Sequence, residues 1–196
     1  MQKILIYNQI KEVTKTEFVN IFEFYIERMM EMKYSILDNS MFESVAPAFF
    51  AILANNMTKI CSTGRTYEED YSLWHEDVSR LVQNDKVNFA VATEEESGEI
   101  AAFFEYHIDG DTFVMDEFQI SEKYHGKGNV FRDMYGFIID NIGEECSYVE
   151  AASNKLNKKS IGVLGTLGLK IVGELHEGSC VQLRGNFADL IKWYRK

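Results

Sequence analysis

The sequence predicts a mixed α/β fold, in which a mostly antiparallel, twisted sheet is flanked by helices, with extra helices near the N-terminus. Residues 87–120 read as three consecutive strands joined by polar turns at 94–98 and 109–111. A Gly-rich turn and a helix follow the third strand, and residues 148–184 then alternate between strand and helix. The chain has one proline and no repeat or linker, which predicts a single domain over residues 1–196.

The N-terminal part is expected to contain one strand and three helices. Residues 3–8 read as the strand, and apolar residues at three- and four-residue spacing predict a helix over about 14–32. A Met- and Phe-rich segment, 41–60, predicts a second helix with Pro47 near its start. The third helix is expected at 67–83, where apolar residues again fall on one side.

From residue 87 onward, strands and helices follow one another at short spacing. Alternating apolar residues predict the strands, and apolar residues three and four positions apart predict the helices. Asn157 and Asn186 precede two of these helices as candidate N-caps. The expected elements are strands at 87–93, 100–108, 112–120, 148–152, 170–175 and 180–184, and helices at 130–142, from 157 onward and at 187–194.

The composition is acidic, with a formal net charge of −11 and a pI near 4.9. This balance disfavours nucleic acid as a partner, because phosphate backbones bind basic surfaces. The three cysteines and four histidines are scattered without ligand spacing, so we expect reduced thiols and no metal site. No signal peptide is apparent, and the most apolar window, 45–54, is too short to cross a bilayer. We therefore expect a cytoplasmic protein with no membrane partner.

The turn before the expected helix at 130–142 has the pattern of an anion-binding loop. Gly126 and Gly128 flank Lys127, and free N–H groups at a helix N-terminus favour a phosphate there. The alternative is that these residues form only a tight turn. A P-loop is excluded because no Ser or Thr follows Lys127, and a dinucleotide fingerprint is excluded because Phe131 stands where the third glycine would be.

A second stretch, at 157–169, combines an N-cap residue, an apolar stripe and a Gly stop. Together, the two stretches resemble the GNAT superfamily of acyl-CoA-dependent N-acetyltransferases, whose motif-bearing core would cover about 87–184. The phosphate loop of that family runs Gln/Arg-x-x-Gly-x-Gly/Ala, and this chain keeps the central glycine but departs from the pattern at His125 and Val130. The second family motif runs Asn-x-x-Ala-x-x-x-Tyr-x-Lys-x-Gly-Phe. Its places fall on Asn157, Ser160, Leu164, Thr166, Gly168 and Leu169.

The resemblance implies an acetyl-CoA site. The backbone near Phe118 and Ile120 would line the pantetheine arm, while Asn157 would bond to it with Ser160 alongside. Asn157 could equally be no more than a helix cap, and Ser160 an ordinary helix residue. The residues implied to hold the pyrophosphate lie in the loop itself: His125, Gly126, Lys127, Gly128, Asn129 and Val130.

Two adjacent carboxylates, Asp116 and Glu117, lie inside an otherwise apolar strand, where such residues are uncommon. Strict alternation would place Glu117 on one face with Phe113, Met115 and Gln119, and Asp116 with Val114 and Phe118 on the other. We expect Glu117 to be the catalytic base, with Glu105 on the preceding strand as the second choice. The alternative is that Asp116 and Glu117 mark an exposed strand end or an ion pair.

The resemblance implies transfer of an acetyl group from acetyl-CoA directly to a primary amine on a small molecule or peptide. Leu164 replaces the tyrosine that protonates the leaving thiolate in the family, but a thiol with a pKa near ~8.5 can leave without a dedicated acid. This departure keeps open a non-catalytic acyl-CoA-binding or regulatory module on the same fold. A structural domain without a cofactor is a further alternative. The oligomeric state stays open, a homodimer included.

Overall fold

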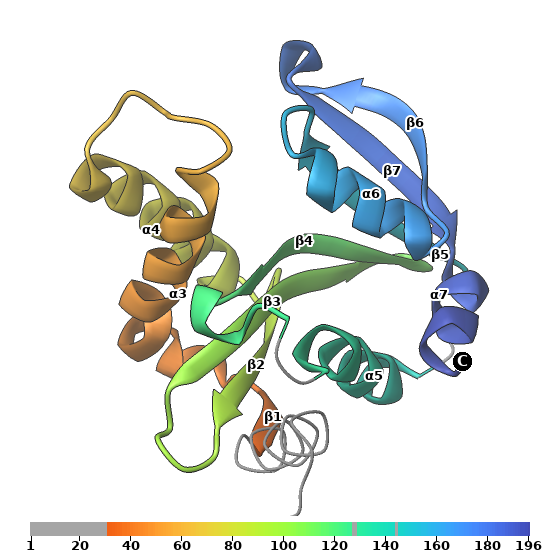
Figure 1. Ribbon diagram of the computed structural model, residues 1–196, viewed down its shortest axis with the longest axis horizontal. Helices are drawn as coiled ribbons and strands as arrows, with labels where there is room; N and C mark the ends of the chain where they lie inside the picture. Colours follow the sequence, from red (N-terminus) through yellow and green to blue (C-terminus); the bar gives the residue numbers. More distant parts are fainter. Residues whose placement is uncertain (1–30, 127–128, 144) are drawn as a thin grey trace, which may run out of the picture.

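The computed structural model describes residues 31–126, 129–143 and 145–196, so the strand expected at 3–8 and most of the helix expected at 14–32 lie outside the described residues. Within the described part, seven strands form one sheet in the order β1-β2-β3-β4-β5-β7-β6 (Figure 1). Among the strands that the structure describes, only β4 and β5 pair in parallel. The strands are β1 (Met32–Ile36), β2 (Asn88–Glu94), β3 (Ile100–Asp109), β4 (Thr112–Ile120), β5 (Tyr148–Asn154), β6 (Lys170–Leu175) and β7 (Cys180–Asn186).

The described helices follow the expected order closely. Helix α4 begins with a capping box between Thr66 and Glu69, which supplies partners for two backbone N–H groups of its first turn. Asn186 occupies the N-cap position of α7, but its side chain makes no capping hydrogen bond, contrary to the expectation. The α-helices are α3 (Phe42–Met57), α4 (Tyr67–Gln83), α5 (Val130–Ile142), α6 (Lys158–Thr166) and α7 (Phe187–Tyr194).

Strand β1 was not predicted, and it begins at the residue where the expected helix would end. The expected helix extended to about Met32, whereas Met32–Ile36 pairs antiparallel with β2. Met32 and Tyr34 pack against the main core, and Lys33 and Ser35 alternate with them. A five-residue strand of this kind is specified by its sheet neighbour more than by its own composition.

Two apolar clusters lie on opposite faces of the sheet. Helices α3 and α4 cover one face, where Phe49 stacks on Phe103 of β3 at a centroid distance of 4.4 Å. On the other face, Phe104 of β3 stacks on Phe118 of β4 at 4.8 Å, and α5 packs over them. Figure 1 shows α3 and α4 well separated from α5 and α7. The sheet thus isolates the environment under α3 from that under α5.

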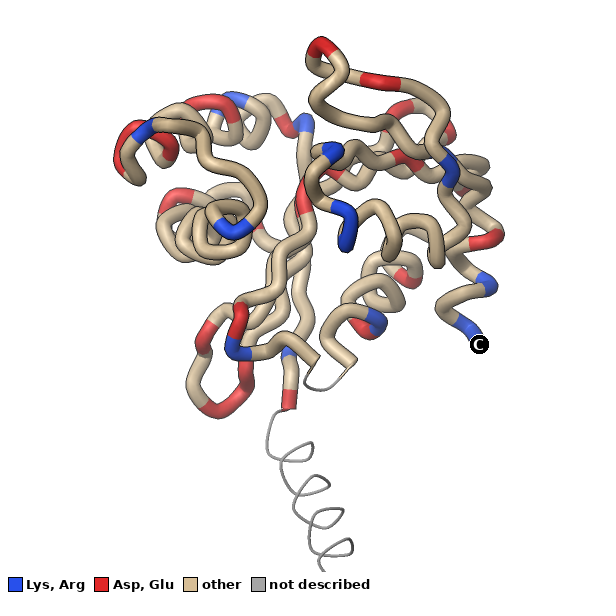
Figure 2. The backbone as a smooth tube through the Cα atoms, turned by 45° about the horizontal axis from the view of Figure 1, so that its top comes forward, with Lys and Arg blue, Asp and Glu red and all other residues tan. Residues whose placement is uncertain are grey.

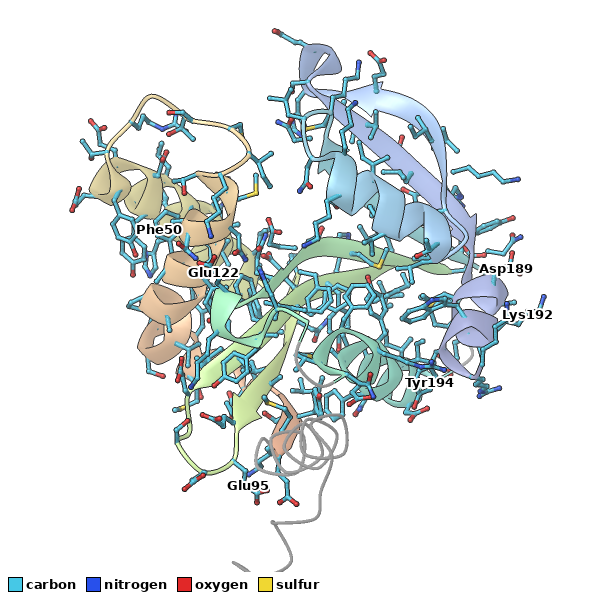
Figure 3. The ribbon with its side chains drawn as sticks, viewed as in Figure 1. Phe50, Glu95, Glu122, Asp189, Lys192 and Tyr194 are labelled. Atoms are coloured by element: carbon cyan, nitrogen blue, oxygen red, sulfur yellow. The ribbon has the colours of Figure 1, made fainter. Side chains whose placement is uncertain are left out.

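Helix α7 closes against α5 through one tight approach. The ring of Tyr194 lies where a Cβ at Gly136 would stand, so any larger residue at that position would require the Tyr194 ring to move. Figure 3 shows Tyr194 on the side of α7 that meets α5. Arg132 of α5 also donates a 2.6 Å hydrogen bond to the carbonyl oxygen of Tyr194. These contacts fix the first turns of α5 relative to the end of the chain.

A β-bulge at Asp116 interrupts the alternation along β4. Met115 pairs with Tyr106, whereas Glu117 pairs with Glu105, so Asp116 is the extra residue. Phe113 and Met115 therefore lie in the main core together with Phe118. The predicted placement of Glu117 on the same face as Phe113 and Met115 is wrong, because the bulge shifts the pleat by one residue.

Candidate functional site

Strands β4 and β5 separate in the middle of the sheet. Their parallel pairing covers Thr112–Met115 of β4 and ends at the Met115–Ala151 pair. Residues 117–120 of β4 stay paired with β3 on one edge and have no β5 partner within the described chain. Apart from the Ile120 carbonyl, which accepts side-chain hydrogen bonds from Asn56 and His125, the backbone groups along this edge have no strand partner among the described residues and are available to an extended ligand. Phe118 and Ile120, whose backbone was predicted to line the pantetheine arm, lie in this part of β4.

A cavity of about 240 Å³ lies beside this open edge, at the N-terminus of α5. Gly126 has a φ of +69°, a backbone conformation that glycine adopts without strain, and a Cβ there would meet nothing within 4 Å. Lys127 and Gly128 of the predicted loop lie outside the described residues. The cavity is lined by Ile120, Tyr124, Gly126, Asn129, Val130, Phe131 and Arg132.

The N-terminus of α5 differs from those of α4 and α6. Thr66 caps α4 and Asn157 caps α6, whereas no side chain caps α5 at Asn129. The first backbone N–H groups of a helix have no partner within the helix. At α5, as at α3 and α7, the side chain of the N-cap residue makes no hydrogen bond to these groups, and the helix dipole favours an anion there. The site therefore fits a phosphate group.

Asn157 adopts the capping role that the sequence left open. Its Oδ1 accepts a 3.0 Å hydrogen bond from the backbone N–H of Ser160. Contacts of Asn157 and Ser160 with a pantetheine arm stay a prediction. Leu164, at the tyrosine place of the family motif, is buried in the main core and can donate no proton.

The end of β4 is hydrogen-bonded both to the loop before α5 and to α3. The carbonyl oxygen of Ile120 accepts hydrogen bonds from His125 Nε2 at 2.8 Å and from Asn56 Nδ2 at 2.9 Å. Figure 3 shows Glu122 beside the end of α3, where its Oε1 lies 2.9 Å from Lys59 Nζ. The His125 ring therefore links the loop before α5 to the backbone at the end of β4. Its ring is already engaged, whatever ligand the cavity takes.

Glu117 lies on the α3 side of the sheet and is half-buried. Gln119 donates from Nε2 to Glu117 Oε1 at 2.7 Å, and Asn56 donates to Gln119 Oε1 at 2.7 Å. Burial raises the pKa of the Glu117 carboxyl, while the Gln119 hydrogen bond counteracts part of this rise. Glu117 is thus a positioned carboxylate that holds its proton more readily than an exposed one.

Glu105 and Asp116 complete an acidic group around Glu117. Glu105 is only 5% exposed, and burial together with Asp116 and Glu117 raises the pKa of its carboxyl to about 8. Asp116 Oδ2 lies 2.6 Å from His107 Nδ1, so the ion-pair interpretation applies to Asp116. Glu117 has no basic partner among the described residues.

The described residues contain no group of three or more His, Cys, Asp or Glu side chains placed to hold a metal ion. Cys61, Cys146 and Cys180 are free thiols. None of the described helices is both long and apolar enough to span a bilayer.

Figure 2 shows acidic positions gathered at the turn between β2 and β3. Glu94 and Glu99 of this turn hold Lys123, at 3.2 and 2.6 Å from its Nζ.

Solved structures reveal which fold this is. PaiA N-acetyltransferase from Thermoplasma acidophilum, solved in complex with coenzyme A, superposes with a TM-score of 0.59 at 14% identity, over 80% of this chain and 99% of that one. An acetyltransferase of the GNAT family from Desulfovibrio desulfuricans gives a TM-score of 0.59 at 10% identity, over 80% and 98%. This chain has the GNAT fold.

The same fold recurs in the ribosomal-protein-S5-alanine acetyltransferase from Vibrio fischeri, with a TM-score of 0.54 at 16% identity, over 79% of this chain and 92% of that one. No protein-family model matches the sequence, and no curated protein matches it. The GNAT resemblance predicted from the motifs is therefore confirmed at the level of the fold.

Sequence reasoning missed two residues of the site on the GNAT scaffold. Asn56 ends an apolar run and reads only as a helix stop, although it bonds to β4 residues more than sixty positions away. His107 carries no motif, and its pairing with Asp116 depends on the bulge. The one available signal was the polar Gln119, which interrupts an apolar strand two residues after Glu117.

Proposed function

We propose that this protein transfers an acetyl group from acetyl-CoA directly to the primary amine of a small molecule or peptide. The observation that carries the proposal is the position of Glu117. It is a half-buried carboxylate on the open part of β4, held by Gln119, in the strand that leads into the cavity at α5. A proton acceptor and an anion site thus lie at two ends of one short segment.

The local geometry supports the cofactor-binding residues that the GNAT resemblance implies. Backbone N–H groups of Gly126 to Val130 would hold the pyrophosphate, because the start of α5 has no side-chain cap. The backbone of Phe118 and Ile120 would bond to the pantetheine arm along the open edge of β4. Acetyl-CoA supplies an activated acetyl thioester. An N–H of this strand facing the thioester oxygen would stabilise the negative charge that develops there.

Glu117 would act as the general base. An amine reaches the protein as an ammonium ion and attacks only after it loses a proton. Glu117 can accept that proton directly or through one water molecule. Its raised pKa helps, because a base works best when its pKa lies near the working pH. The leaving thiolate needs no proton donor, which is consistent with Leu164 at the tyrosine place.

Leu164 also supports a second candidate, a non-catalytic acyl-CoA-binding module. Two measurements separate the candidates. In a thermal-shift experiment, acetyl-CoA should stabilise the protein by about 2.7 kcal/mol at a hundredfold excess over its Kd. Thiol release with a panel of amines then tests turnover. Stabilisation without thiol release for any amine supports the module. Absence of stabilisation by acetyl-CoA and by bare CoA contradicts both candidates.

A further inference from the structure

We propose that the acceptor carries a second positive charge, which binds Glu105 and Asp116 beside the amine that reacts at Glu117. The acceptor class is thus an aliphatic diamine or polyamine. This inference rests on the proposed function, since it concerns the acceptor side of the same site. It is carried by an acidic cluster, defined as Glu105, Asp116 and Glu117, and by the unpartnered state of Glu105.

The register of β3 and β4 brings the acidic cluster together. Glu105 lies directly opposite Glu117, and the bulge adds Asp116 one step along the strand. Asp116 faces His107 of β3, which lies two residues from Glu105. Residues that face each other across antiparallel strands have Cβ atoms about 4.5–5.5 Å apart, and the next pair along lies about 7 Å away.

Glu105 is the most informative member of the cluster. It is 5% exposed and makes no hydrogen bond or ion pair to any residue of the described chain. Among the described residues, every side-chain oxygen that is fully shielded from solvent has a hydrogen-bond partner. Because the Glu105 carboxylate has no such partner, its oxygens must be in contact with solvent. A deeply buried carboxylate with an open oxygen and no protein partner is arranged to receive a donor from outside the chain.

Among the described residues, no Lys or Arg forms an ion pair with the cluster. Phe89 is the register partner of Glu105 on β2, and Phe49 and Asn56 reach the same face from α3. His107, beside Asp116, is the one basic side chain in contact with the cluster among the described residues. Like charges facing each other across a strand pair destabilise the sheet. A bound dication would offset this repulsion and so favour the ionised form of Glu105, whose carboxyl the fold otherwise keeps protonated below about pH 8.

The spacing of the carboxylates distinguishes a diamine from a simple amine. One ammonium group can lose its proton to Glu117 while a second, about 5–7 Å away, stays charged between Glu105 and Asp116. A neutral alkyl tail would leave Glu105 unpartnered. A carboxylate tail, as in an amino acid, would add a further negative charge. The preference of the protein among amine acceptors should therefore depend on the charge at the far end of the acceptor.

The test uses three acceptors of similar length with acetyl-CoA: 1,4-diaminobutane, butylamine and 4-aminobutyrate. We expect kcat/KM to be at least about tenfold higher for 1,4-diaminobutane than for butylamine, and lowest for 4-aminobutyrate. Glu105→Gln and Asp116→Asn should each reduce the ratio of the diamine to butylamine. Asp109→Asn is the matched control, because Asp109 is an exposed carboxylate on the same strand, and this variant should keep the ratio.

A binding experiment separates the failure of this inference from the failure of the proposed function. Calorimetry of the protein with bare CoA should show tighter binding of 1,4-diaminobutane than of butylamine, with release of a proton near neutral pH. Glu105→Gln should abolish the proton release. If no amine is acetylated, the proposed function fails and calorimetry still decides the inference. Equal kcat/KM for the three acceptors, or equal binding of the two amines, overturns the inference.

Discussion

The side chain of Asn56, near the end of α3, donates a 2.7 Å hydrogen bond to Oε1 of Gln119 in β4. Because the Gln119 oxygen is used in this way, its amide NH₂ group must turn toward Glu117, to which it donates at 2.7 Å. A residue of helix α3 thereby fixes the orientation of the Gln119 amide beside the proposed base. The same Asn56 nitrogen donates to Ile120, so the network also holds the end of β4.

Replacing Asn56 tests this network. In Asn56→Ala, Gln119 is free to flip and to present its oxygen to Glu117, which would misplace the carboxylate and favour its protonated form. We expect kcat to fall by about 10–100-fold and the acidic limb of the pH–rate profile to move to higher pH. Asn55→Ala is the control, because Asn55 is adjacent in sequence but bonds to the exposed Glu122. Equal losses in the two variants would contradict the positioning role.

The role of Glu117 predicts a separation of binding from turnover. Glu117→Gln keeps the shape of the side chain but cannot accept a proton. We expect the stabilisation by acetyl-CoA to be unchanged and kcat to fall by roughly 10²–10⁴-fold near neutral pH. The loss should shrink at high pH, where the acceptor amine is already neutral. A parent-like rate in this variant would rule Glu117 out and direct the same test to Glu105.

Gly126 offers a test of the anion site with a close control. Alanine at Gly126 must adopt a φ of +69°, which strains the loop by about 1–2 kcal/mol without a steric clash. Gly98, in the turn after β2, has the same φ and the same open space. We expect Gly126→Ala to weaken CoA binding about tenfold or more, while Gly98→Ala should lose similar stability and bind CoA normally.

Should both glycine variants bind CoA like the parent, the loop before α5 would not be the pyrophosphate site. Isothermal titration with bare CoA measures the affinities directly. Urea unfolding of the two variants without ligand shows whether their losses of stability are comparable.

The order of elements from residue 41 onward was predictable, because regularly spaced apolar residues indicate each helix or strand and turn residues mark its ends. The β2–β4 meander and the helix starts after Thr66 and Asn157 are examples. Strand β1 was not predictable, since its five residues depend on pairing with β2. The turn at Gly126 could be found from the sequence because its positive φ is a backbone conformation that glycine signals directly.

The acceptor side of the site was less readable for a physical reason. A bulge adds one residue to a strand without any fixed sequence pattern, and the faces of all later residues then change. Asp116 is that residue, so alternation misplaced Glu117 relative to Phe113. Gln119, held by Asn56, is the partner of Glu117, and His107 is the partner of Asp116. Secondary-structure propensity and the spacing of apolar residues cannot reveal such tertiary contacts.

The buried Glu105 predicts a specific dependence of stability on pH. Its carboxyl has an ordinary pKa of 4.5 and a pKa of about 8 in the fold. Between these values the folded protein keeps a proton that the unfolded chain has lost. Stability from this group is therefore complete below about pH 4.5 and declines as pH rises, until it is lost above about pH 8. The whole change is on the order of 3–5 kcal/mol.

Glu105→Gln isolates this contribution, because glutamine has a similar shape and does not ionise. The unfolding free energy of the parent minus that of the variant should fall as pH rises from about 5 to 8.5, by up to the same few kcal/mol. Urea titrations at several pH values across this window measure the difference. Asp109→Asn removes an exposed carboxylate from the same strand and serves as the reference for a simple change of charge. A pH-independent difference between the parent and Glu105→Gln would mean that Glu105 ionises in the fold as it does in the unfolded chain.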